Sequence, residues 1–319
     1  MTTTVAVRVS EVTDEATDVR SLRLVTTDGS PLGPYPAGAH VDVVGPTGVR
    51  RQYSLCSPPD DPASLLIAVK REQASRGGSA ALHEVRVGDT LEIGAPRNLL
   101  ALADDADHHL LVAGGIGVTP LLSMAYELHR RGADFTLHYF ARSREEAAFA
   151  DLLEHRAEFR ERVHLHFGVP RADQPGVLST HVDSLTGASR VYTCGPDGFM
   201  DQVAATLGPI VGADHVYVEH FVAAEVDTSD DQAFVVELDT GEEFEIPADR
   251  SILSVLDENG IEVFKSCEEG VCGSCVSGVL EGVPDHRDSC LSAADHAAND
   301  QMALCVSRAH TARLTIELY

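Results

Sequence analysis

The chain has 319 residues, of which 44% are hydrophobic, and its 24 Lys and Arg against 50 Asp and Glu give a formal net charge of −26. This composition is typical of a globular protein with two or three domains, and the negative charge excludes nucleic acid as a partner. No apolar run approaches the ~20 residues of a membrane span. The first residues lack a signal-peptide core, so we expect a cytoplasmic protein.

Residues 1–103 contain short alternating strands separated by Gly- and Pro-rich turns. The strand patterns lie at 4–12, 19–26, 40–44 and 64–70. A series of short strands with such turns predicts a small β-barrel with little room for helices.

Residues 104–225 alternate apolar strands with amphipathic helices. The strand HHLLVA at 108–113 leads through GGIGVTP into a helical pattern at 121–132. A strand FTLHYFA, a helix at 145–159, a strand VHLHFG and the segment VYTCGP follow, and the last opens a helix at 197–207. Because strands without polar positions are buried on both faces, this order predicts an α/β doubly wound parallel sheet.

An acidic linker is expected at 226–232, followed by a third domain at 233–319. The pattern there indicates a hairpin turning at Asp239-Thr240-Gly241, a short helix with Ile252, Leu253 and Leu256 inward, and a final strand at 313–318. From residue 226 onward, 20 Asp and Glu stand against 5 Lys and Arg, a net charge of 5 − 20 = −15. Charge alone favours a solvated acidic surface over a docking face for a basic partner.

Three cysteines crowd into SCEEGVCGSC, and a fourth lies near the end of the chain. Cys267, Cys272, Cys275 and Cys305 have the spacing Cys-x4-Cys-x2-Cys, and 29 residues separate the last two. A disulfide framework is not expected, because the total of seven cysteines is odd and cytoplasmic thiols stay reduced. Structural zinc usually needs a second Cys-x2-Cys pair, which is missing here. The spacing is that of a plant-type [2Fe–2S] cluster, with zinc as the alternative.

With this loop, residues 233–319 resemble a plant-type ferredoxin domain, a small β-grasp fold with its cluster in an exposed loop. The resemblance implies a one-electron carrier of low reduction potential.

Two turns are candidate nucleotide-binding positions. Gly114, Gly115 and Gly117 in GGIGVTP stand between a buried strand and a helix, where backbone N–H groups can face a pyrophosphate. A glycine-rich turn without a ligand fits that context equally well. Thr119 is expected to cap the helix. The turn Cys194-Gly195-Pro196 ends a later strand, at the edge where ligands bind in such sheets.

The motifs RQYSL, GGIGVTP and CGP together resemble the ferredoxin–NADP reductase superfamily. In that superfamily an Arg-x-Tyr-Ser motif lies on the flavin barrel, and here it is Arg51, Gln52, Tyr53 and Ser54. Arginine pairs bidentately with phosphate, a tyrosine ring packs on the isoalloxazine, and a serine hydroxyl can reach the flavin N5. Taken singly, Arg51 would be a surface ion pair and Tyr53 a core aromatic.

The order of flavin barrel, nucleotide domain and C-terminal ferredoxin narrows the resemblance to the phthalate dioxygenase reductase family, which includes vanillate demethylase reductases. The resemblance covers essentially the whole chain and implies FMN, NADH and a [2Fe–2S] cluster. Hydride transfer then needs no acid–base residue, only positioning, with Ser54, Cys194 and Phe221 near the flavin or the nicotinamide. The implied flavin contacts are Arg51, Gln52, Tyr53, Ser54, Ala68, Val69, Lys70, Gly77, Gly78, Ser79, Thr119 and Phe221. The implied NAD contacts are Gly114, Gly115, Gly117, Arg142, Ser143, Cys194, Gly195 and Pro196.

Some of these contacts have specific alternatives. Arg142, Ser143 and Arg144 follow the second strand of the nucleotide domain and could cradle a 2′-phosphate, selecting NADPH, or be solvated residues at a helix start. The resemblance favours NADH. Phe221 rests on the short match EHF and could equally be a core phenylalanine.

The resemblance implies a reductase that passes electrons from NADH through FMN and the cluster to a partner oxygenase. That partner would be a Rieske-type aromatic oxygenase or demethylase, or a haem monooxygenase, docking through a basic surface on a monomeric reductase. One alternative is a flavin oxidoreductase acting on free flavin or small acceptors, whose activity would survive loss of the cluster. A non-enzymatic alternative is a metal-binding interaction or sensor module, which would contain no flavin.

Overall fold

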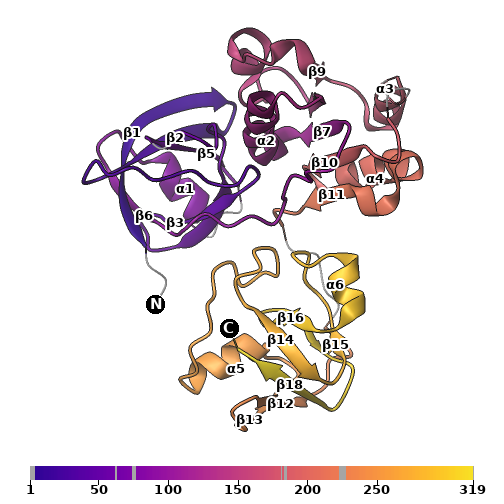
Figure 1. The fold of residues 1–319 in the computed structure, drawn as a ribbon. Helices are drawn as coiled ribbons and strands as arrows, with labels where there is room; N and C mark the ends of the chain where they lie inside the picture. Colours follow the sequence, from indigo (N-terminus) through magenta and orange to yellow (C-terminus); the bar gives the residue numbers. More distant parts are fainter. Residues whose placement is uncertain are drawn as a thin grey trace. The chain divides into compact units, whose positions relative to one another are not determined.

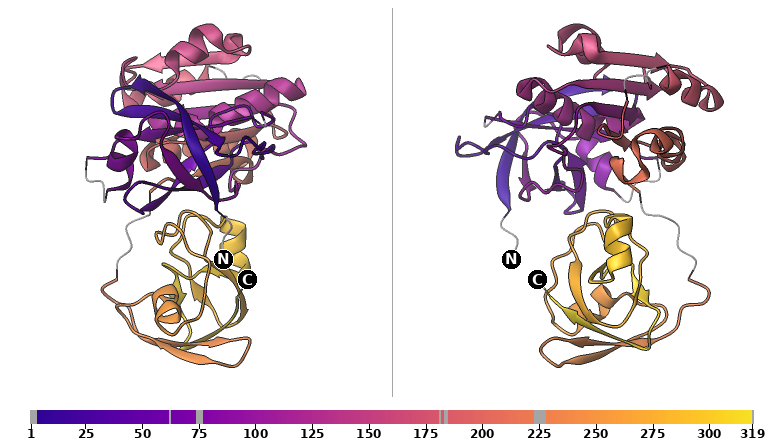
Figure 2. Two further views of the ribbon diagram at one scale, coloured as in Figure 1. Left: turned by 90° about the vertical axis from the view of Figure 1, so that its left-hand side faces the viewer. Right: turned by 45° about the vertical axis from the view of Figure 1, so that its right-hand side comes forward.

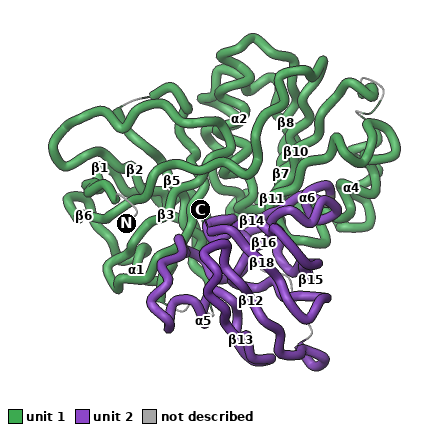
Figure 3. The backbone as a smooth tube through the Cα atoms, turned by 60° about the horizontal axis from the view of Figure 1, so that its bottom comes forward, with its two compact units in different colours: residues 1–219 green, residues 220–319 purple. Residues whose placement is uncertain are grey.

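A computed structural model describes residues 4–61, 63–73, 77–180, 182, 185–222 and 228–318 (Figure 1). The chain divides into two compact units, residues 1–219 and 220–319 (Figure 3). The predicted linker at 226–232 begins outside the described residues, at 226 and 227. Among the described residues, no helix is both long and apolar enough to cross a membrane.

The first unit begins with six antiparallel strands that curl into a barrel. They are β1 (Val5–Ala16), β2 (Val19–Thr26), β3 (His40–Val44), β4 (Arg50–Ser54), β5 (Leu65–Lys70) and β6 (Thr90–Ile93). Their order is β4-β3-β6-β1-β2-β5, and an isolated bridge between Leu55 and Ile67 brings the two end strands together. A short helix that the sequence did not predict, α1 (Gly78–His83), follows β5.

The second layer of this unit is a five-stranded parallel sheet in the order β11-β10-β7-β8-β9. Its strands are β7 (His109–Gly114), β8 (Phe135–Ala141), β9 (Val163–Phe167), β10 (Arg190–Cys194) and β11 (Val216–Glu219). The helices are α2 (Val118–Arg131), α3 (Gln174–Ser179) and α4 (Asp197–Val211), with 3₁₀ turns η1 (Gly115–Gly117), η3 (Arg160–Arg162), η4 (Arg171–Asp173) and η6 (Ala213–His215).

The pattern of β7 explains why helices cover both faces of this sheet. Leu111 and Ala113 share a buried cluster with residues of α2, whereas Leu110 and Val112 share one with residues of α4. Since successive side chains of a strand point to opposite faces, α2 and α4 lie on opposite sides of the sheet. The doubly wound sheet expected from the sequence is confirmed.

The helix predicted at 145–159 is wrong. The structure has irregular turns there and a π-helical turn, η2 (Leu152–Arg156). Phe149 has a φ of 61°, a left-handed conformation that a helix interior does not contain. Phe149 and its alanine neighbours are buried in the cluster that includes α2, so the apolar spacing reflects packing of a turn.

The second unit is a small mixed sheet of five strands in the order β13-β12-β18-β14-β16. Its elements are β12 (Phe234–Leu238), β13 (Glu243–Ile246), α5 (Ile252–Glu258), β14 (Val276–Glu281), β15 (Pro284–Asp285), α6 (Ala293–Ala298), β16 (Gln301–Ala303), β17 (Arg308–Ala309) and β18 (Arg313–Glu317). Strands β12 and β18 are parallel, and β12 forms the expected hairpin with β13. The views of Figure 2 show α5 and α6 in different parts of this unit. This is the β-grasp topology expected of a ferredoxin domain.

Helix α5 forms as its sequence predicts. The Ser251 hydroxyl accepts a hydrogen bond from the Ser254 N–H at 3.1 Å and caps the helix. Ile252, Leu253 and Leu256 are at most 3% exposed, so the predicted inward face is the buried one.

Candidate cofactor sites

The four cysteines of the predicted cluster lie together in the second unit. Cys267, Cys272 and Cys275 come from the loop between α5 and β14, and Cys305 lies in the tight turn that follows β16. All four are buried, with 4–8% of each residue exposed. The antiparallel pairing of β14 with β16 brings the distant cysteine in, since the Leu304 N–H donates to the Cys275 carbonyl at 3.2 Å.

Hydrogen bonds between thiols connect the four sulfurs in two pairs. The hydrogen bond from Cys272 lowers the pKa of Cys267 to about 7 and raises the pKa of Cys272 itself. In the same way, the hydrogen bond with Cys305 lowers the pKa of Cys275 and raises that of Cys305. The Glu269 N–H also donates to the Cys267 sulfur at 3.3 Å. Converging sulfurs with backbone N–H donors fit a group that requires thiolates, as an iron–sulfur cluster does.

The glycine inside the cysteine loop is required by both its conformation and its neighbours. Gly270 has a φ of +75°, and a Cβ there would lie 2.7 Å from the Val306 side chain and 3.1 Å from the Asp288 Cα. The Ser289 N–H donates to the Gly270 carbonyl at 3.0 Å. The loop therefore packs tightly on the segment that follows β15.

The residues predicted to contact the flavin ring meet where the barrel closes. The antiparallel bridge between Leu55 and Ile67 places Ser54, at the end of β4, beside Ala68 of β5. Ser54 and Ala68 are each 6% exposed. Tyr53, which precedes Ser54, is half-buried, and burial raises the pKa of its hydroxyl to about 12. Tyr53 therefore presents a neutral ring.

The residues predicted to contact the flavin phosphate also come together. The Arg51 stem packs on the first turn of α1, so a Cβ at Gly78 would lie 3.1 Å from the Arg51 Cγ. Gly77, with a φ of +101°, directly precedes α1. The Ser79 hydroxyl accepts from the Glu72 N–H at 3.2 Å, which ties the phosphate segment to the end of β5. Backbone N–H groups beside one arginine fit a phosphate.

Three other predicted flavin residues have structural partners of their own. The Gln52 amide donates to the buried Asp42 carboxylate at 2.7 Å, and Lys70 forms an ion pair with Glu72 at 3.1 Å. The side chain of Val69 is fully buried in the barrel core, which leaves its backbone for any ligand. The structure thus favours backbone contacts along β5.

The two predicted nucleotide turns lie against each other at the carboxyl end of the parallel sheet. A Cβ on Gly117 would lie 2.1 Å from the Cys194 carbonyl oxygen and 2.6 Å from the Gly195 nitrogen. A Cβ on Gly195 would lie 3.0 Å from the Gly114 Cα. The glycines thus allow the turn after β7 to approach the turn after β10. Gly115, with a φ of +56°, faces open space, and Pro196 directly precedes α4.

Thr119 is buried at the start of α2 but does not cap it. Its hydroxyl donates to the Ile116 carbonyl at 2.9 Å, and no side chain caps the helix at Gly117. The predicted capping role is wrong, because the 3₁₀ turn η1 runs directly into α2. The predicted place of Thr119 beside the flavin stays a prediction.

The sequence analysis missed one acidic residue at this edge, Glu219. It ends β11 directly beside Cys194 of β10 and is 8% exposed. Burial raises the pKa of Glu219 to about 8, and burial also raises the pKa of the Cys194 thiol, so both are protonated near neutral pH. The signal was available, since Glu219 is the first residue of the EHF match, but nothing local in the sequence marks an acid as buried.

Two buried oxygen atoms at this edge lack hydrogen-bond partners among the described residues. They are the Glu219 Oε2 and the Thr193 Oγ1. The register pairs Thr193 with Val218 and Glu219 with Cys194, so the Thr193 and Glu219 side chains point to opposite faces of the sheet. The Glu219 carboxyl, which shares its face of the sheet with Cys194, fits a ligand amide such as the nicotinamide carboxamide, because the amide offers both donors and an acceptor.

The residues predicted to choose between NADH and NADPH follow β8. The Arg142 side chain is 89% exposed and lies 3.8 Å from Glu146. Arg144 forms an ion pair with Glu154, and Ser143 donates to Glu145, which lowers the pKa of that carboxyl. Of the three, Arg142 therefore has the most exposed side chain.

Phe221 follows β11, is 37% exposed, and belongs to the second unit. Its predicted position over the flavin ring stays a prediction.

Comparisons with known proteins agree with this geometry. The family of the 2Fe-2S iron-sulfur cluster binding domain matches residues 235–310. A vanillate O-demethylase oxidoreductase of Pseudomonas sp. (strain HR199 / DSM 7063) is 44% identical over 306 residues, 95% of this chain and 96% of that protein. The structure of phthalate dioxygenase reductase, described as modular for electron transfer from pyridine nucleotides to [2Fe–2S], is 38% identical with a TM-score of 0.71, over 99% of this chain and 98% of that one. An intact type IV self-sufficient cytochrome P450 monooxygenase is 36% identical with a TM-score of 0.87, over 98% of this chain and 41% of that longer chain.

Proposed function

This chain belongs to the phthalate dioxygenase reductase family, and from that premise we propose that it carries electrons from NADH through FMN and a [2Fe–2S] cluster to a partner oxygenase. Membership makes it an oxidoreductase with a C-terminal ferredoxin domain. The observation that carries the proposal is the convergence of four buried cysteine sulfurs on one loop and one strand end of that domain.

We assign the cluster to Cys267, Cys272, Cys275 and Cys305. Their thiols hydrogen-bond in two pairs, and backbone N–H groups point at the sulfurs. Such donors stabilise thiolates and would tune the reduction potential of the bound cluster. The remaining cysteine of this unit, Cys290, lies outside the set: its thiol donates to the Asp288 carboxylate at 3.3 Å.

We assign the flavin to the closed edge of the barrel and the phosphate to the turn before α1. FMN, when bound, supplies the conversion between a two-electron donor and a one-electron acceptor. The protein residues orient it: Arg51 pairs with the phosphate, Tyr53 packs against the ring, and the buried Ser54 hydroxyl reaches its edge. These residues supply shape and charge, and none is required as an acid or a base.

We assign the nicotinamide to the edge formed by the turns after β7 and β10. Gly114 and Gly117 bring these turns together, and Glu219 leaves a buried oxygen for the carboxamide. Because Arg144 is engaged by Glu154, a 2′-phosphate would find mainly the exposed Arg142, and this supports NADH over NADPH.

We place the partner's contact on the acidic second unit. Glu262 and Glu268 are exposed next to the cysteine loop, and the region from residue 226 carries a net charge of −15, from 20 acidic and 5 basic residues. A basic patch on a Rieske-type or haem oxygenase would therefore associate fast and weakly with a monomeric reductase in the cytoplasm. Electron delivery to the partner should then slow steeply with added salt, whereas reduction of the flavin by NADH should not. Salt-independent delivery would remove electrostatic docking from the proposal.

Stopped-flow reduction of Cys272→Ser tests the electron route. The variant should lose the cluster, so that NADH still bleaches the flavin at a near-normal rate while reduction of cytochrome c collapses by at least about a hundredfold. Cys290→Ser is the matched control, because it removes a cysteine of the same unit without touching the assigned ligands.

The same experiment separates the alternatives. Cytochrome c reduction that survives in Cys272→Ser would favour a reductase of free flavin or small acceptors. Protein purified with no flavin would favour an interaction or sensor module.

A further inference from the structure

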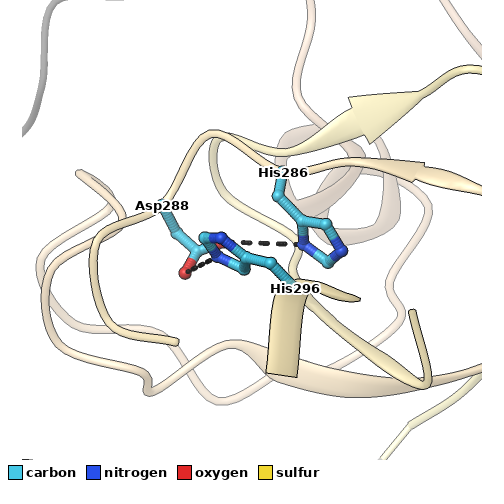
Figure 4. Close-up of side chains that lie close together, drawn as sticks. All are labelled: His286, Asp288 and His296. Atoms are coloured by element: carbon cyan, nitrogen blue, oxygen red, sulfur yellow. Dashed lines mark hydrogen bonds and ion pairs between the residues drawn. The ribbon is translucent and has the colours of Figure 1, made fainter. Parts of the chain in front are cut away.

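Three side chains of the second unit meet beside the cysteine loop without a part in the electron route. His286 and Asp288 follow β15, and His296 comes from α6 (Figure 4). Their nearest donor atoms lie within 4.8 Å of one another. The His296 Nε2 lies 3.4 Å from the Asp288 Oδ2, and the His286 Nδ1 lies 4.0 Å from the Asp288 Oδ1. The two imidazoles stack with centroids 4.4 Å apart, so both nitrogens face the same carboxylate.

One nitrogen in this group has no hydrogen-bond partner among the described residues, the Nδ1 of His286. The His286 side chain is only 10% exposed. Its Nε2 lies 3.2 Å from the Asn299 Oδ1, an acceptor, so the hydrogen-bond network assigns the proton of a neutral ring to Nε2. The lone pair of Nδ1 then faces the Asp288 oxygen across 4.0 Å. Because two facing acceptors repel each other, a cation between them would be bound by both.

The buried Asp288 carboxylate also favours a cation at this position. Its side chain is completely buried and accepts from the Leu291 N–H at 3.0 Å and the Ser307 hydroxyl at 3.2 Å. The adjacent Arg287 does not neutralise it, because that guanidinium pairs with Asp231 and Asp285 at 2.6 Å each. A buried carboxylate is stable when a cation is close.

We propose that the His286 Nδ1, the Asp288 carboxylate and the His296 Nε2 bind a divalent transition-metal ion of the zinc class. Two imidazoles and one carboxylate suit zinc, whereas Mg²⁺ and Ca²⁺ prefer oxygen ligands. Tetrahedral zinc with bonds of about 2.0–2.2 Å needs donors roughly 3.4 Å apart. The His296 to Asp288 distance already has this value, at 3.4 Å. The His296 side chain is 30% exposed, so it can turn onto the ion and leave a fourth position to water.

The hydrogen bond from His286 to Asn299 has a role in this site. A ligating histidine usually donates its other ring N–H to an oxygen that fixes its orientation. Asn299 supplies that oxygen; it directly follows α6 in a left-handed conformation, with a φ of 55°.

The ion would brace the cysteine loop. Asp288 lies against Gly270, where a Cβ would approach its Cα to 3.1 Å, and the next residue, Ser289, donates to the Gly270 carbonyl. Gly270 stands between the assigned ligands Cys267 and Cys272. Binding therefore favours the folded loop, about tenfold at an ion concentration ten times the dissociation constant.

The test is a zinc titration of the full-length holoprotein, stripped of loosely bound metal and with its iron content measured before and after. The expected result is one Zn²⁺ bound per chain with the iron count unchanged, and zinc anomalous scattering between the three side chains in crystals. His286→Gln and His296→Gln should each weaken zinc binding at least about tenfold, and Asp288→Asn at least as much. His310→Gln, which removes an exposed imidazole of the same unit, should bind as the parent does.

Three results would overturn the proposal. They are no zinc beyond a background level, equal binding in His296→Gln and the parent, and zinc that enters only as iron leaves, which would place it on the cysteines. His296→Gln keeps the test decisive if the buried variants do not fold, because His296 is the most exposed of the three.

Discussion

The cysteine loop of the second unit and the nucleotide edge of the first unit serve the same electron route with opposite means. In the loop we assign the chemistry to four side chains of one type, and their spacing matches what bonds to a small cluster require. At the nucleotide edge the key residues are glycines, and their work is to let two backbone turns approach. The proposed cluster site thus depends on the identity of its side chains, whereas the proposed nucleotide site depends mostly on the shape of the backbone.

Gly117→Ala should have the largest effect, because it should impair the nucleotide edge and leave the cysteine loop unchanged. The new Cβ would lie 2.1 Å from the Cys194 carbonyl oxygen, an overlap that only displacement of a backbone turn can relieve. We expect NADH-dependent flavin reduction to fall at least about a thousandfold, while the visible and EPR spectra of the dithionite-reduced cluster stay unchanged. Gly115→Ala meets nothing within 4 Å and adds only the backbone strain of an alanine at a φ of +56°, so it should cost far less. Equal losses in both variants would contradict the close-approach argument.

Glu219→Gln should show how much the burial of one carboxyl group at the nucleotide edge affects the pH dependence of stability. Burial raises the pKa of Glu219 from 4.5 to about 8, so between these values the folded chain keeps a proton that the unfolded chain has lost. Stability of the parent should therefore fall as pH rises, by about 2.5 kcal/mol between pH 5 and pH 7. The variant should lack this slope in urea unfolding of the flavin and nucleotide unit. Parallel profiles for the two proteins would show that Glu219 titrates normally.

Arg51→Gln should affect the flavin alone. Loss of a charged partner for the phosphate should raise the dissociation constant of FMN about thirtyfold, measured by fluorescence of the released flavin. Arg50→Gln is the control, since neighbouring residues of a strand point to opposite faces. Iron and sulfide content should be the same in all three proteins, and a similar weakening in Arg50→Gln would place the phosphate elsewhere.

The smallest effect is expected on the surface of the second unit. Removing two exposed charges beside the cysteine loop, in Glu262→Gln with Glu268→Gln, should slow electron transfer to a basic oxygenase about threefold at low salt. Glu281→Gln with Glu317→Gln removes the same charge from other exposed positions. If the two pairs slow transfer equally, only the net charge matters and the docking face is not at the loop.

The sequence could predict those features of the molecule that have a local pattern along the chain. The cluster ligands, the barrel strands and the parallel sheet all have local signatures, either a spacing or a period. The turn at Phe149 broke the helical pattern because a buried left-handed residue looks like any apolar residue in a sequence. The predicted cap of α2 was wrong because the hydroxyl of Thr119 donates to the carbonyl of the earlier residue Ile116, a contact that the sequence does not mark.

The sequence also did not predict which residues distant along the chain become neighbours in the fold. Glu219 became notable only when β11 set it beside Cys194, and the group of His286, Asp288 and His296 only when α6 folded over the segment after β15. Neither has a motif, because each depends on residues that the fold brings together.

Counting the cofactors of one purified sample tests the central claim most directly, with the flavin identified by mass and iron and labile sulfide measured in the same material. We predict FMN together with about two irons and two sulfides per chain, and bleaching of both chromophores when NADH is added without oxygen. Zinc on the cysteines with no labile sulfide, or a cluster that NADH leaves oxidised while it reduces the flavin, would contradict the account.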